Sequence, residues 1–259
     1  MRIVIVGAGG RLGRELVRAV ARDARFRLCG ATVRADSPLL GRDATELLGL
    51  APCGVALSAD LHAFRDAADV LIDFTTPEAT FQHASWAAEA GVPLVVGTTG
   101  LSGDITAHLR TCAARIAIVY SPNFSVGVNL LWHLASAAGA AWGASPAIEI
   151  EETHHIHKKD APSGTAKRLH EVVSLATGRP REAISVVSHR NGEVVGDHCI
   201  RFDTAGETLT LTHHAKSRAV FADGAVGAAA WAVGRPAGWY GMDHVLGLTS
   251  VRHPEREDA

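Results

Sequence analysis

The stretch RIVIVGAGGRLG, residues 2–13, decides the fold of this chain. Its first five residues form a short run rich in β-branched side chains, as expected for a strand that is buried on both faces. Gly7, Gly10 and Gly13 follow, with Gly9 as an extra glycine, and apolar residues then recur at helical spacing. Strand, glycine turn and helix in this order predict a βα turn that receives the pyrophosphate of a dinucleotide at the helix N-terminus. The alternative is a tight turn that binds no ligand.

Further strand-like and helix-like segments alternate after this opening. The expected strands are 26–34, 68–74, 93–100 and the start of 116–129, and the expected helices are 14–23, 78–91 and 105–114. This alternation predicts an α/β fold with a Rossmann-like, doubly wound parallel sheet. In such sheets the ligand lies beyond the carboxyl ends of the strands, so residues 73–77, 97–100 and 121–125 should line one cleft.

The pattern changes near residue 126. The expected elements are a helix over 127–141, a strand over 147–155, a helix over 165–177 and alternating strands over 184–217. Turn signals at Asn191-Gly192 and Ala205-Gly206 predict that these alternating strands form a meander. We therefore expect an inserted α+β domain over 126–218, between the two parts of a dinucleotide-binding domain, 1–125 and 219–259.

Composition excludes several classes of protein. The chain has 259 residues, of which 47% are hydrophobic and 20% charged, with a net charge of −2. These values are typical of a folded globular protein and exclude general disorder. The small net charge favours neither nucleic acid nor an anionic membrane as a partner, so a local cluster must hold any anionic ligand.

Cysteine spacing and the N-terminus bear on the location of the protein. Cys29, Cys53, Cys112 and Cys199 lie far apart and form no CxxC pair, which indicates reduced cysteines and no zinc site. The N-terminus has no signal-peptide pattern, and no apolar run approaches 18 residues. We expect a cytoplasmic protein without a membrane span.

The stretch HHIHKKDAPSGT, residues 154–165, carries the densest group of titratable side chains. Three interpretations compete: a metal site, a solvated basic loop and an anion-binding catalytic site. Adjacent histidines on a strand point to opposite faces, and Lys158 and Lys159 oppose a cation, so we expect no metal.

The catalytic interpretation uses more of these residues. Lys158 is a fixed cation, and Ser163, Gly164 and Thr165 open a helix whose N-terminus favours a carboxylate. A histidine beside them can serve as a general acid near neutral pH. Together with a nicotinamide cofactor, these residues indicate hydride transfer to a small carboxylated substrate.

Several stretches along nearly the whole chain resemble one enzyme family. They are GAGGRLGREL, IDFTTPEAT, VVGTTGL, NFSVGVN, IEIEETHHIHKKDAPSGTA and FADGAVGAA. They resemble the 4-hydroxy-tetrahydrodipicolinate reductase (dihydrodipicolinate reductase) family of the diaminopimelate–lysine pathway. The most specific motif is E-x-H-H-x-x-K-x-D-x-P-S-G-T, within residues 149–166.

The resemblance implies an activity and an assembly. It implies NAD(P)H-dependent reduction of a cyclic, imine-like dicarboxylate at C4, with loss of its hydroxyl group as water. It also implies a homotetramer assembled through the sheets of the substrate domains, and hinge closure between the two domains.

The resemblance also implies roles for individual residues. His154 matches the family's proton donor/acceptor, and Lys158 matches its proton-donor lysine. The implied substrate contacts are His155, Lys158, Ser163, Gly164 and Thr165. The implied cofactor contacts are the pyrophosphate loop Gly7, Ala8, Gly9, Gly10, Arg11 and Leu12, the nicotinamide loops Gly97, Thr98, Thr99, Ser121, Pro122, Asn123 and Phe124, and the hinge residues Arg218 and Phe221.

One position departs from the family's pattern. Many members carry an acidic residue after the second strand to bind the adenosine ribose, whereas this chain has Val33 followed by Arg34. Thr76 also stands where an arginine is often found. Without the carboxylate the 2′-hydroxyl group of NADH loses a partner, and Arg34 could hold the 2′-phosphate of NADPH. We expect NADPH and/or NADH as cofactor, with a preference for NADPH; the alternative is that Arg34 stacks on adenine and serves both.

Two other functions compete with this one. The first is a reductase of the same architecture that acts on another cyclic imine or keto acid. The second is a non-catalytic NAD(P)-binding redox sensor, which need not keep His154, Lys158 and the residues 163–165 together. Their joint presence argues against the sensor.

Overall fold

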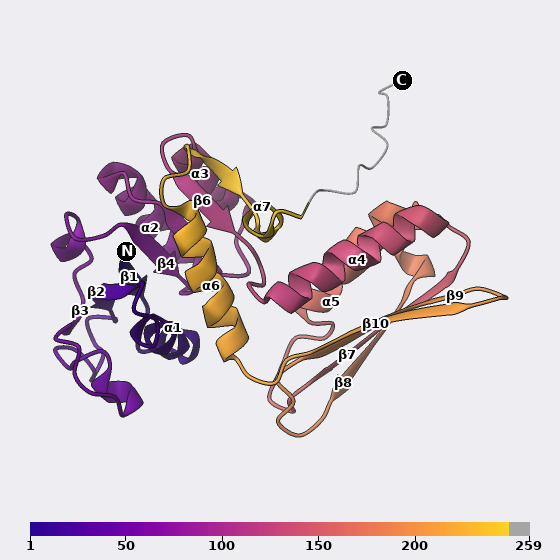
Figure 1. Cartoon of the computed structure of the whole chain (residues 1–259), viewed down its shortest axis with the longest axis horizontal. Helices are drawn as coiled ribbons and strands as arrows, with labels where there is room; N and C mark the ends of the chain where they lie inside the picture. The colour runs from indigo at the N-terminus through magenta and orange to yellow at the C-terminus, as the bar shows by residue number, and fades with distance from the viewer. Residues whose placement is uncertain (249–259) are drawn as a thin grey trace. The chain divides into compact units, whose positions relative to one another are not determined.

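The computed structural model describes residues 1–248, which divide into two compact units. Unit 1 contains Met1–Phe124 and Arg218–Leu246, and unit 2 contains Ser125–Ser217 (Figure 1). The expected domain junctions, 125/126 and 218/219, each differ from these unit boundaries by one residue. The end of the expected first domain, 249–259, lies outside the described residues.

Unit 1 is built on a seven-stranded sheet with the order β11-β6-β5-β4-β1-β2-β3. Its strands are β1 (Arg2–Val6), β2 (Arg27–Thr32), β3 (Leu57–Ser58), β4 (Val70–Asp73), β5 (Leu94–Val96), β6 (Ala117–Tyr120) and β11 (Gly238–Tyr240). Every neighbouring pair is parallel. The predicted parallel sheet is confirmed; the two edge strands, β3 and β11, were not predicted because they are too short to show a periodic pattern.

Helices cover both faces of this sheet (Figure 1). They are α1 (Arg11–Ala21), α2 (Pro77–Ala90), α3 (Gly103–Ala113), α6 (Ala219–Ala232) and α7 (Met242–Leu246), with 3-10 turns at Glu46–Leu48 and His62–Phe64. Successive residues of β1 enter different cores: Ile3 and Ile5 pack with α1 and α6, and Val4 and Val6 pack with α2 and α3. Because side chains of a strand alternate between faces, the continuous apolar run RIVIV is what a doubly wound sheet requires.

Close packing of α6 on the loop after β6 depends on one glycine. A Cβ atom at Gly224 would lie 1.8 Å from the carbonyl oxygen of Phe124, whereas a Cβ at Gly227, in the same helix, would meet nothing within 4 Å. We expect Gly224→Ala to lower the free energy of unfolding by about 1–3 kcal/mol, because the backbone must shift to admit the methyl group. Gly227→Ala should instead raise it by roughly 0.5–1 kcal/mol. Thermal unfolding of both variants tests this packing, and equal melting temperatures would contradict it.

Unit 2 is a four-stranded sheet with two helices on one face. Its elements are α4 (Val126–Trp142), β7 (Ala147–His154), α5 (Gly164–Thr177), β8 (Ser185–Arg190), β9 (Asp197–Asp203) and β10 (Thr208–His214), with a 3-10 turn at Arg181–Ala183. Ile150 of β7 and Phe202 of β9 are fully buried beneath α4 and α5, in one core with Leu131 and Leu169. The predicted α+β character of this part of the chain is confirmed.

The predicted meander is wrong at one of its two turns. The strand order is β10-β9-β7-β8, so β7 lies between β8 and β9, parallel to β8 and antiparallel to β9. Ala205-Gly206 does connect the adjacent antiparallel strands β9 and β10, but Asn191-Gly192 connects strands that are not neighbours. Alternation identifies strands, but it cannot identify their partners, because the pairing of β7 joins segments distant in sequence.

None of the helices formed by residues 1–248 is both long and apolar enough to cross a bilayer.

Candidate functional site

A pocket of about 590 Å³ opens in unit 1 at the carboxyl ends of β1, β2 and β4. Its lining is Gly7, Gly9, Gly10, Thr32, Val33, Arg34, Ser37, Leu39, Ala59, Leu61, Phe74, Thr75, Thr76, Ala79 and His83. The structure therefore brings Gly7, Gly9, Gly10 and Arg34 together at one pocket. Among the described residues, the other members of the predicted pyrophosphate loop, Ala8, Arg11 and Leu12, lie outside this lining.

The glycines of the first turn leave room in this pocket for a dinucleotide. Gly7 has a φ of +70°, which favours glycine, and a Cβ there would lie 2.7 Å from Thr75. A Cβ at Gly9 would lie 2.9 Å from Leu39 and 3.2 Å from Val33, so a larger residue would fill the pocket. Gly10 is the N-cap of α1, and the helix N-terminus therefore adjoins the pocket, where its dipole favours a phosphate.

The end of the pocket at β2 carries a cation and no carboxylate. Val33 is buried, and the Arg34 side chain is 88% exposed, with its Nε 3.6 Å from Oδ1 of Asp36. None of the described lining residues is acidic. An exposed arginine that is held only by one exposed carboxylate can turn to a phosphate at small cost.

The two predicted nicotinamide loops follow β5 and β6. In the first, Thr98 is buried and hydrogen-bonded to Thr80 at 2.8 Å, and a Cβ at Gly97 would overlap the ring of Phe74. In the second, the Ser121 hydroxyl donates to the carbonyl of Asn123 at 2.6 Å, and Phe124 packs edge-on against Phe74. Phe74 lines the pocket and contacts both loops, but no residue of 97–100 or 121–125 belongs to the described lining, so the single cleft expected from the sequence is found only for its first segment. In the second loop, Pro122 is exposed between Ser121 and Asn123. In the first loop, Thr99 follows Thr98.

Two further predicted residues belong to the start of α6. Arg218 is its N-cap residue and is exposed, and Phe221 lies in its first turn. Within the described chain, neither residue lines the pocket.

A buried carboxylate holds two residues of the pocket lining, Thr75 and His83, although it does not line the pocket itself. Asp73, the last residue of β4, is fully buried and accepts hydrogen bonds from the Thr75 backbone at 2.8 Å and from the Thr75 hydroxyl. Its other oxygen lies 2.9 Å from Nδ1 of His83, which comes from α2 and lines the pocket. The sequence analysis placed residue 73 in a segment expected at the cleft but gave it no role of its own. The pair holds the loop after β4 in place.

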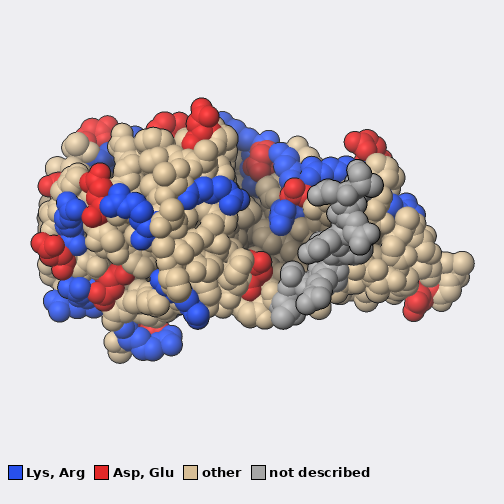
Figure 2. All heavy atoms as spheres, turned by 90° about the horizontal axis from the view of Figure 1, so that it is seen from above, with Lys and Arg blue, Asp and Glu red and all other residues tan. Residues whose placement is uncertain are grey.

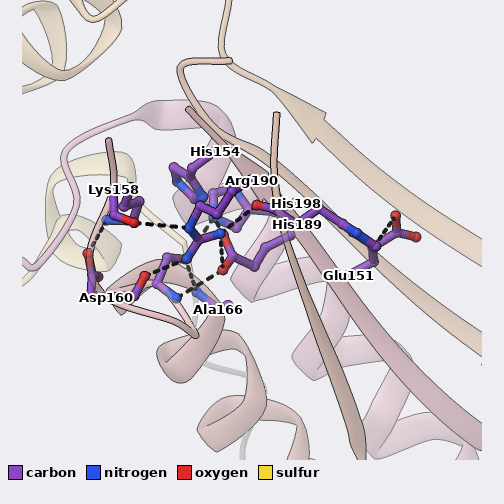
Figure 3. A network of polar contacts seen from close by, with 10 residues as sticks. Glu151, His154, Lys158, Asp160, Ala166, His189, Arg190 and His198 are labelled. Carbon is purple, nitrogen blue, oxygen red and sulfur yellow. Dashed lines mark hydrogen bonds and ion pairs between the residues drawn. The ribbon is translucent and has the colours of Figure 1, made fainter. Parts of the chain in front are cut away.

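In unit 2 the sheet brings together a second group of polar side chains. Glu152 and His154 are two residues apart on β7 and so lie on one face. The strand register places Arg190 of β8 opposite His154, and His198 of β9 opposite Glu152. Figure 3 shows Arg190 among these contacts, with dashed lines to Lys158 and Asp160.

Glu152 is the buried anion of this group. Its Oε1 accepts hydrogen bonds from Arg190 at 3.1 Å and from the Ser163 backbone at 3.3 Å, and its Oε2 contacts Nδ1 of His154. Burial by itself raises the pKa of Glu152, but the hydrogen bond from Ser188, the charge of a protonated His154 and the hydrogen bonds from Arg190 and His154 lower it overall. Glu152 is therefore ionised at neutral pH.

The two buried histidines beside it are neutral at pH 7. Burial lowers the pKa of His154, although Glu152 opposes this shift. Burial, with the charges of His154 and His213, lowers the pKa of His198 to about 3. The Nε2 of His198 lies 3.3 Å from the Ser163 hydroxyl, so His198 adjoins the start of α5.

Lys158 lies in the loop after β7 with its side chain 22% exposed, and its Nζ is 2.8 Å from Oδ1 of Asp160. Burial opposes ionisation of Asp160, but the hydrogen bond and charge of Lys158 lower its pKa overall. The backbone of this loop is held by Arg190, which donates to the carbonyl oxygens of Lys158 and Asp160. His155 begins the loop, and its ring lies 6.0 Å from that of His157.

The predicted carboxylate-binding residues form the start of α5. Ser163 is the N-cap residue, and its hydroxyl accepts a hydrogen bond from the backbone of Ala166 at 3.2 Å. Gly164 and Thr165 are the first residues of the helix, where the helix dipole favours an anion. Because the Ser163 backbone also donates to Glu152, this helix start and His154 share one buried anchor.

Three members of the cluster have metal-ligand chemistry. Glu152, His154 and His198 offer donor atoms that all lie within 4.8 Å of one another. The guanidinium of Arg190 is hydrogen-bonded to the carboxylate, and its positive charge opposes a second cation there. The arrangement suits proton transfer and anion binding better than metal binding.

Arg190 and His198 were missed by sequence reasoning. They lie 38 and 46 positions after Glu152 on other strands, and nothing in their local sequence marks them. Glu152 does carry a signal, because it opens the motif E-x-H-H.

Charged side chains of both signs are interspersed on the face shown in Figure 2.

Comparison with known proteins gives matches over nearly the whole chain. Residues 1–124 match the family model described as dihydrodipicolinate reductase, N-terminus, and residues 127–246 match the model described as dihydrodipicolinate reductase, C-terminus. The 4-hydroxy-tetrahydrodipicolinate reductase of Anaeromyxobacter dehalogenans (strain 2CP-1 / ATCC BAA-258) is 44% identical over 264 residues, covering 95% of this chain and 98% of that protein. That of Acinetobacter baumannii (strain AYE) is 43% identical, covering 97% and 98%.

A solved structure agrees with these matches. Dipicolinate-bound dihydrodipicolinate reductase from Paenisporosarcina sp. TG-14 superposes with a TM-score of 0.79 at 25% identity, covering 94% of this chain and 98% of that one.

Proposed function

The chain belongs to the dihydrodipicolinate reductase family, and we propose that its unit 1 holds the dinucleotide while its unit 2 binds the substrate and moves its protons. The chain is an oxidoreductase that reduces 4-hydroxy-tetrahydrodipicolinate with NAD(P)H, with loss of water, in diaminopimelate and lysine biosynthesis. The observation that carries the proposed roles is the buried frame in unit 2, in which Glu152 and Arg190 hold His154, the loop of Lys158 and the start of α5 together.

The substrate contacts follow from charge. A ring with two carboxylates needs a cation and hydrogen-bond donors, and Lys158 with the start of α5 supplies both. The solved relative from Paenisporosarcina is described as bound to dipicolinate, itself a dicarboxylate. We assign carboxylate and ring contacts to His155, Lys158, Ser163, Gly164 and Thr165.

The proton chemistry falls to His154 and Lys158. When bound, the nicotinamide supplies the hydride that adds at C4 of the ring. Prior loss of the C4 hydroxyl group as water would leave a C=C bond conjugated with the C=N bond of the ring, so the electron pair displaced by the hydride would move to the ring nitrogen. Lys158 offers a positive charge and a proton to that nitrogen. His154 presents a neutral imidazole with its Nδ1 directed at Glu152, so its Nε2 is the atom that accepts and returns a substrate proton.

A direct assay tests this function. Oxidation of NADPH or NADH is followed with freshly prepared 4-hydroxy-tetrahydrodipicolinate. We expect turnover that depends on this substrate, and the absence of turnover with both cofactors would overturn the assignment. Turnover of another cyclic imine or keto acid in preference to this compound would support the alternative reductase.

Location and assembly stay predictions from the family resemblance: a cytoplasmic homotetramer with hinge closure between its domains. All of the expected cofactor contacts also stay predictions, both those that line the pocket, Gly7, Gly9, Gly10 and Arg34, and those that do not, Ala8, Arg11, Leu12, Gly97, Thr98, Thr99, Ser121, Pro122, Asn123, Phe124, Arg218 and Phe221.

The cofactor preference is our next proposal, and it depends on Arg34. The pocket offers an exposed guanidinium near Val33 and no carboxylate among its described lining residues, an arrangement that suits the 2′-phosphate of NADPH. We expect Arg34→Ala to weaken NADPH binding by about one to two decades, since a charged hydrogen bond is worth roughly 1.5–3 kcal/mol. NADH should bind almost unchanged. Dissociation constants of both cofactors, measured without substrate, and their KM values test this.

Two variants complete this test. Val33→Glu should move the preference toward NADH, because a carboxylate recognises the ribose hydroxyls and repels the phosphate. Asp36→Asn removes the exposed partner of Arg34 and should leave NADPH binding unchanged or slightly tighter. Equal losses of NADH and NADPH affinity in Arg34→Ala would show that the arginine stacks on adenine.

A further inference from the structure

The fully buried Glu152 forms an ion pair with the partly buried Arg190, and this pair adjoins the proposed catalytic residues. We infer that Glu152 is the positioning residue that sets the tautomer of His154, and that Arg190 holds Glu152 and the loop 155–160 in one frame. This inference deepens the proposed function and rests on it, because it takes His154 as the group that handles a substrate proton.

The hydrogen bonds of Glu152 determine which nitrogen of His154 carries the proton. Oε1 accepts hydrogen bonds from Arg190 and the Ser163 backbone, the Ser188 side chain also donates to the carboxylate, and Oε2 is directed at Nδ1 of His154. An ionised carboxylate can only accept hydrogen bonds, so Nδ1 must donate and Nε2 keeps its lone pair. The space beside Nε2 is kept clear by Gly196, at which a Cβ would lie 3.0 Å from that atom.

Arg190 connects the two proton-handling groups. Its guanidinium donates to Glu152 at 3.1 Å, to the carbonyl of Lys158 at 3.2 Å and to the carbonyl of Asp160. The Asp160 carboxylate in turn pairs with the ammonium group of Lys158 at 2.8 Å. A planar group with five donors can make these contacts at once, which a lysine could not do. His154 and Lys158 are thus held by one side chain that comes from β8.

Charged and titratable groups surround His154 from every strand of the sheet. Glu152 faces it from β7, Arg190 from β8 and His198 from β9, with His213 of β10 behind His198. Lys158 acts on it from the loop, where its ammonium group pairs with Asp160. Of these, Glu152 favours the protonated imidazole, and Lys158 and Arg190 oppose it. Removing the charge of Glu152 should therefore lower the pKa of His154 further.

The first test is Glu152→Gln. The Ser163 backbone and Arg190 still require an acceptor, so the amide oxygen takes the place of Oε1 and the NH₂ group faces Nδ1 of His154. That geometry forces the His154 proton onto Nε2 and removes the acceptor. We expect kcat to fall about 10- to 100-fold, the usual effect of losing a partner that orients a functional histidine. The dissociation constant of NADPH should not change, and the acidic limb of the pH profile should move to lower pH.

A matched control lies on the same strand. Glu149 is exposed and pairs with Arg201 at 2.9 Å, outside the cluster. Glu149→Gln should leave kcat and the pH profile at wild-type values. The variant Arg190→Lys keeps the positive charge but loses the planar guanidinium group with its several donors. It should raise the KM of the substrate and lower kcat, because the backbone of the loop of Lys158 loses its hydrogen bonds. If the Arg190→Lys variant kept the wild-type kcat and substrate KM, the role assigned to Arg190 would be overturned.

Two double variants distinguish a loss of activity caused by poor folding from a loss caused by the wrong tautomer of His154. Glu152→Gln with Arg190→Met removes the unpaired buried charge, and it should fold yet stay slow; recovery of wild-type kcat would overturn the inference. In a His154→Gln background, Glu152→Gln should cost less than about threefold, since it acts through the missing imidazole. An undiminished cost there would show that Glu152 acts elsewhere. Wild-type turnover of His154→Gln alone would instead overturn the proton role of His154 itself, and this inference with it.

Discussion

Replacing Lys158 with alanine should lower kcat by about 150-fold or more, because removing a charged hydrogen bond to a developing anion costs about 3 kcal/mol or more. The affinity for NADPH should change much less, because Lys158 belongs to unit 2 and the cofactor pocket is formed by unit 1. Steady-state kinetics together with cofactor binding in the absence of substrate measure the two effects separately. Collapse of cofactor binding with preserved turnover would contradict the role of Lys158.

Two controls isolate the charge of Lys158 from the structure of its loop. Lys159→Ala removes the exposed neighbouring charge and should leave kcat close to wild type. Asp160→Asn breaks the ion pair with Lys158 but keeps the ammonium group, so it should lose far less activity than Lys158→Ala. Equal losses in Asp160→Asn and Lys158→Ala would assign the effect to the ion pair.

Replacing His154 with glutamine should lower kcat by about 10²- to 10³-fold, within the range of general acid–base catalysis. The wild-type enzyme should lose activity as the pH falls below about 6.5, because burial places the pKa of His154 below its ordinary value and protonation then removes the acceptor at Nε2. In His154→Gln this acidic limb should be absent. The pH dependence of kcat for both enzymes is the measurement.

A second histidine serves as the control for this variant. His189 lies on β8, one residue before Arg190, and it is half exposed beside Glu151. His189→Gln should keep both the rate and the acidic limb. An acidic limb that persists in His154→Gln would show that another group titrates there, and the proton role assigned to His154 would be wrong.

The sequence alone determined the parts of this protein whose signals are local. The run RIVIV with its glycines specified a strand buried on both faces and a glycine turn that leads into a helix, and the structure has them as β1, the turn at residues 7–10 and the start of α1. Phosphate binding at this turn stays a prediction. The motif in residues 149–166 led to the family and to His154 and Lys158, because the spacing of these residues within one segment is specific by itself.

Only the tertiary structure decided the neighbours of that motif. Arg190 and His198 reach Glu152 because β7 lies between β8 and β9, a pairing that alternation along the chain cannot predict. The same pairing shows that β8 and β9 are not neighbours, so the predicted meander was wrong at Asn191-Gly192. The protonation state of His154 could not be predicted from the sequence either, because burial and the nearby charges of Glu152, Lys158 and Arg190 set it. Hydrophobic period and turn chemistry act between near neighbours, whereas strand order, burial and electrostatics depend on residues that only folding brings together.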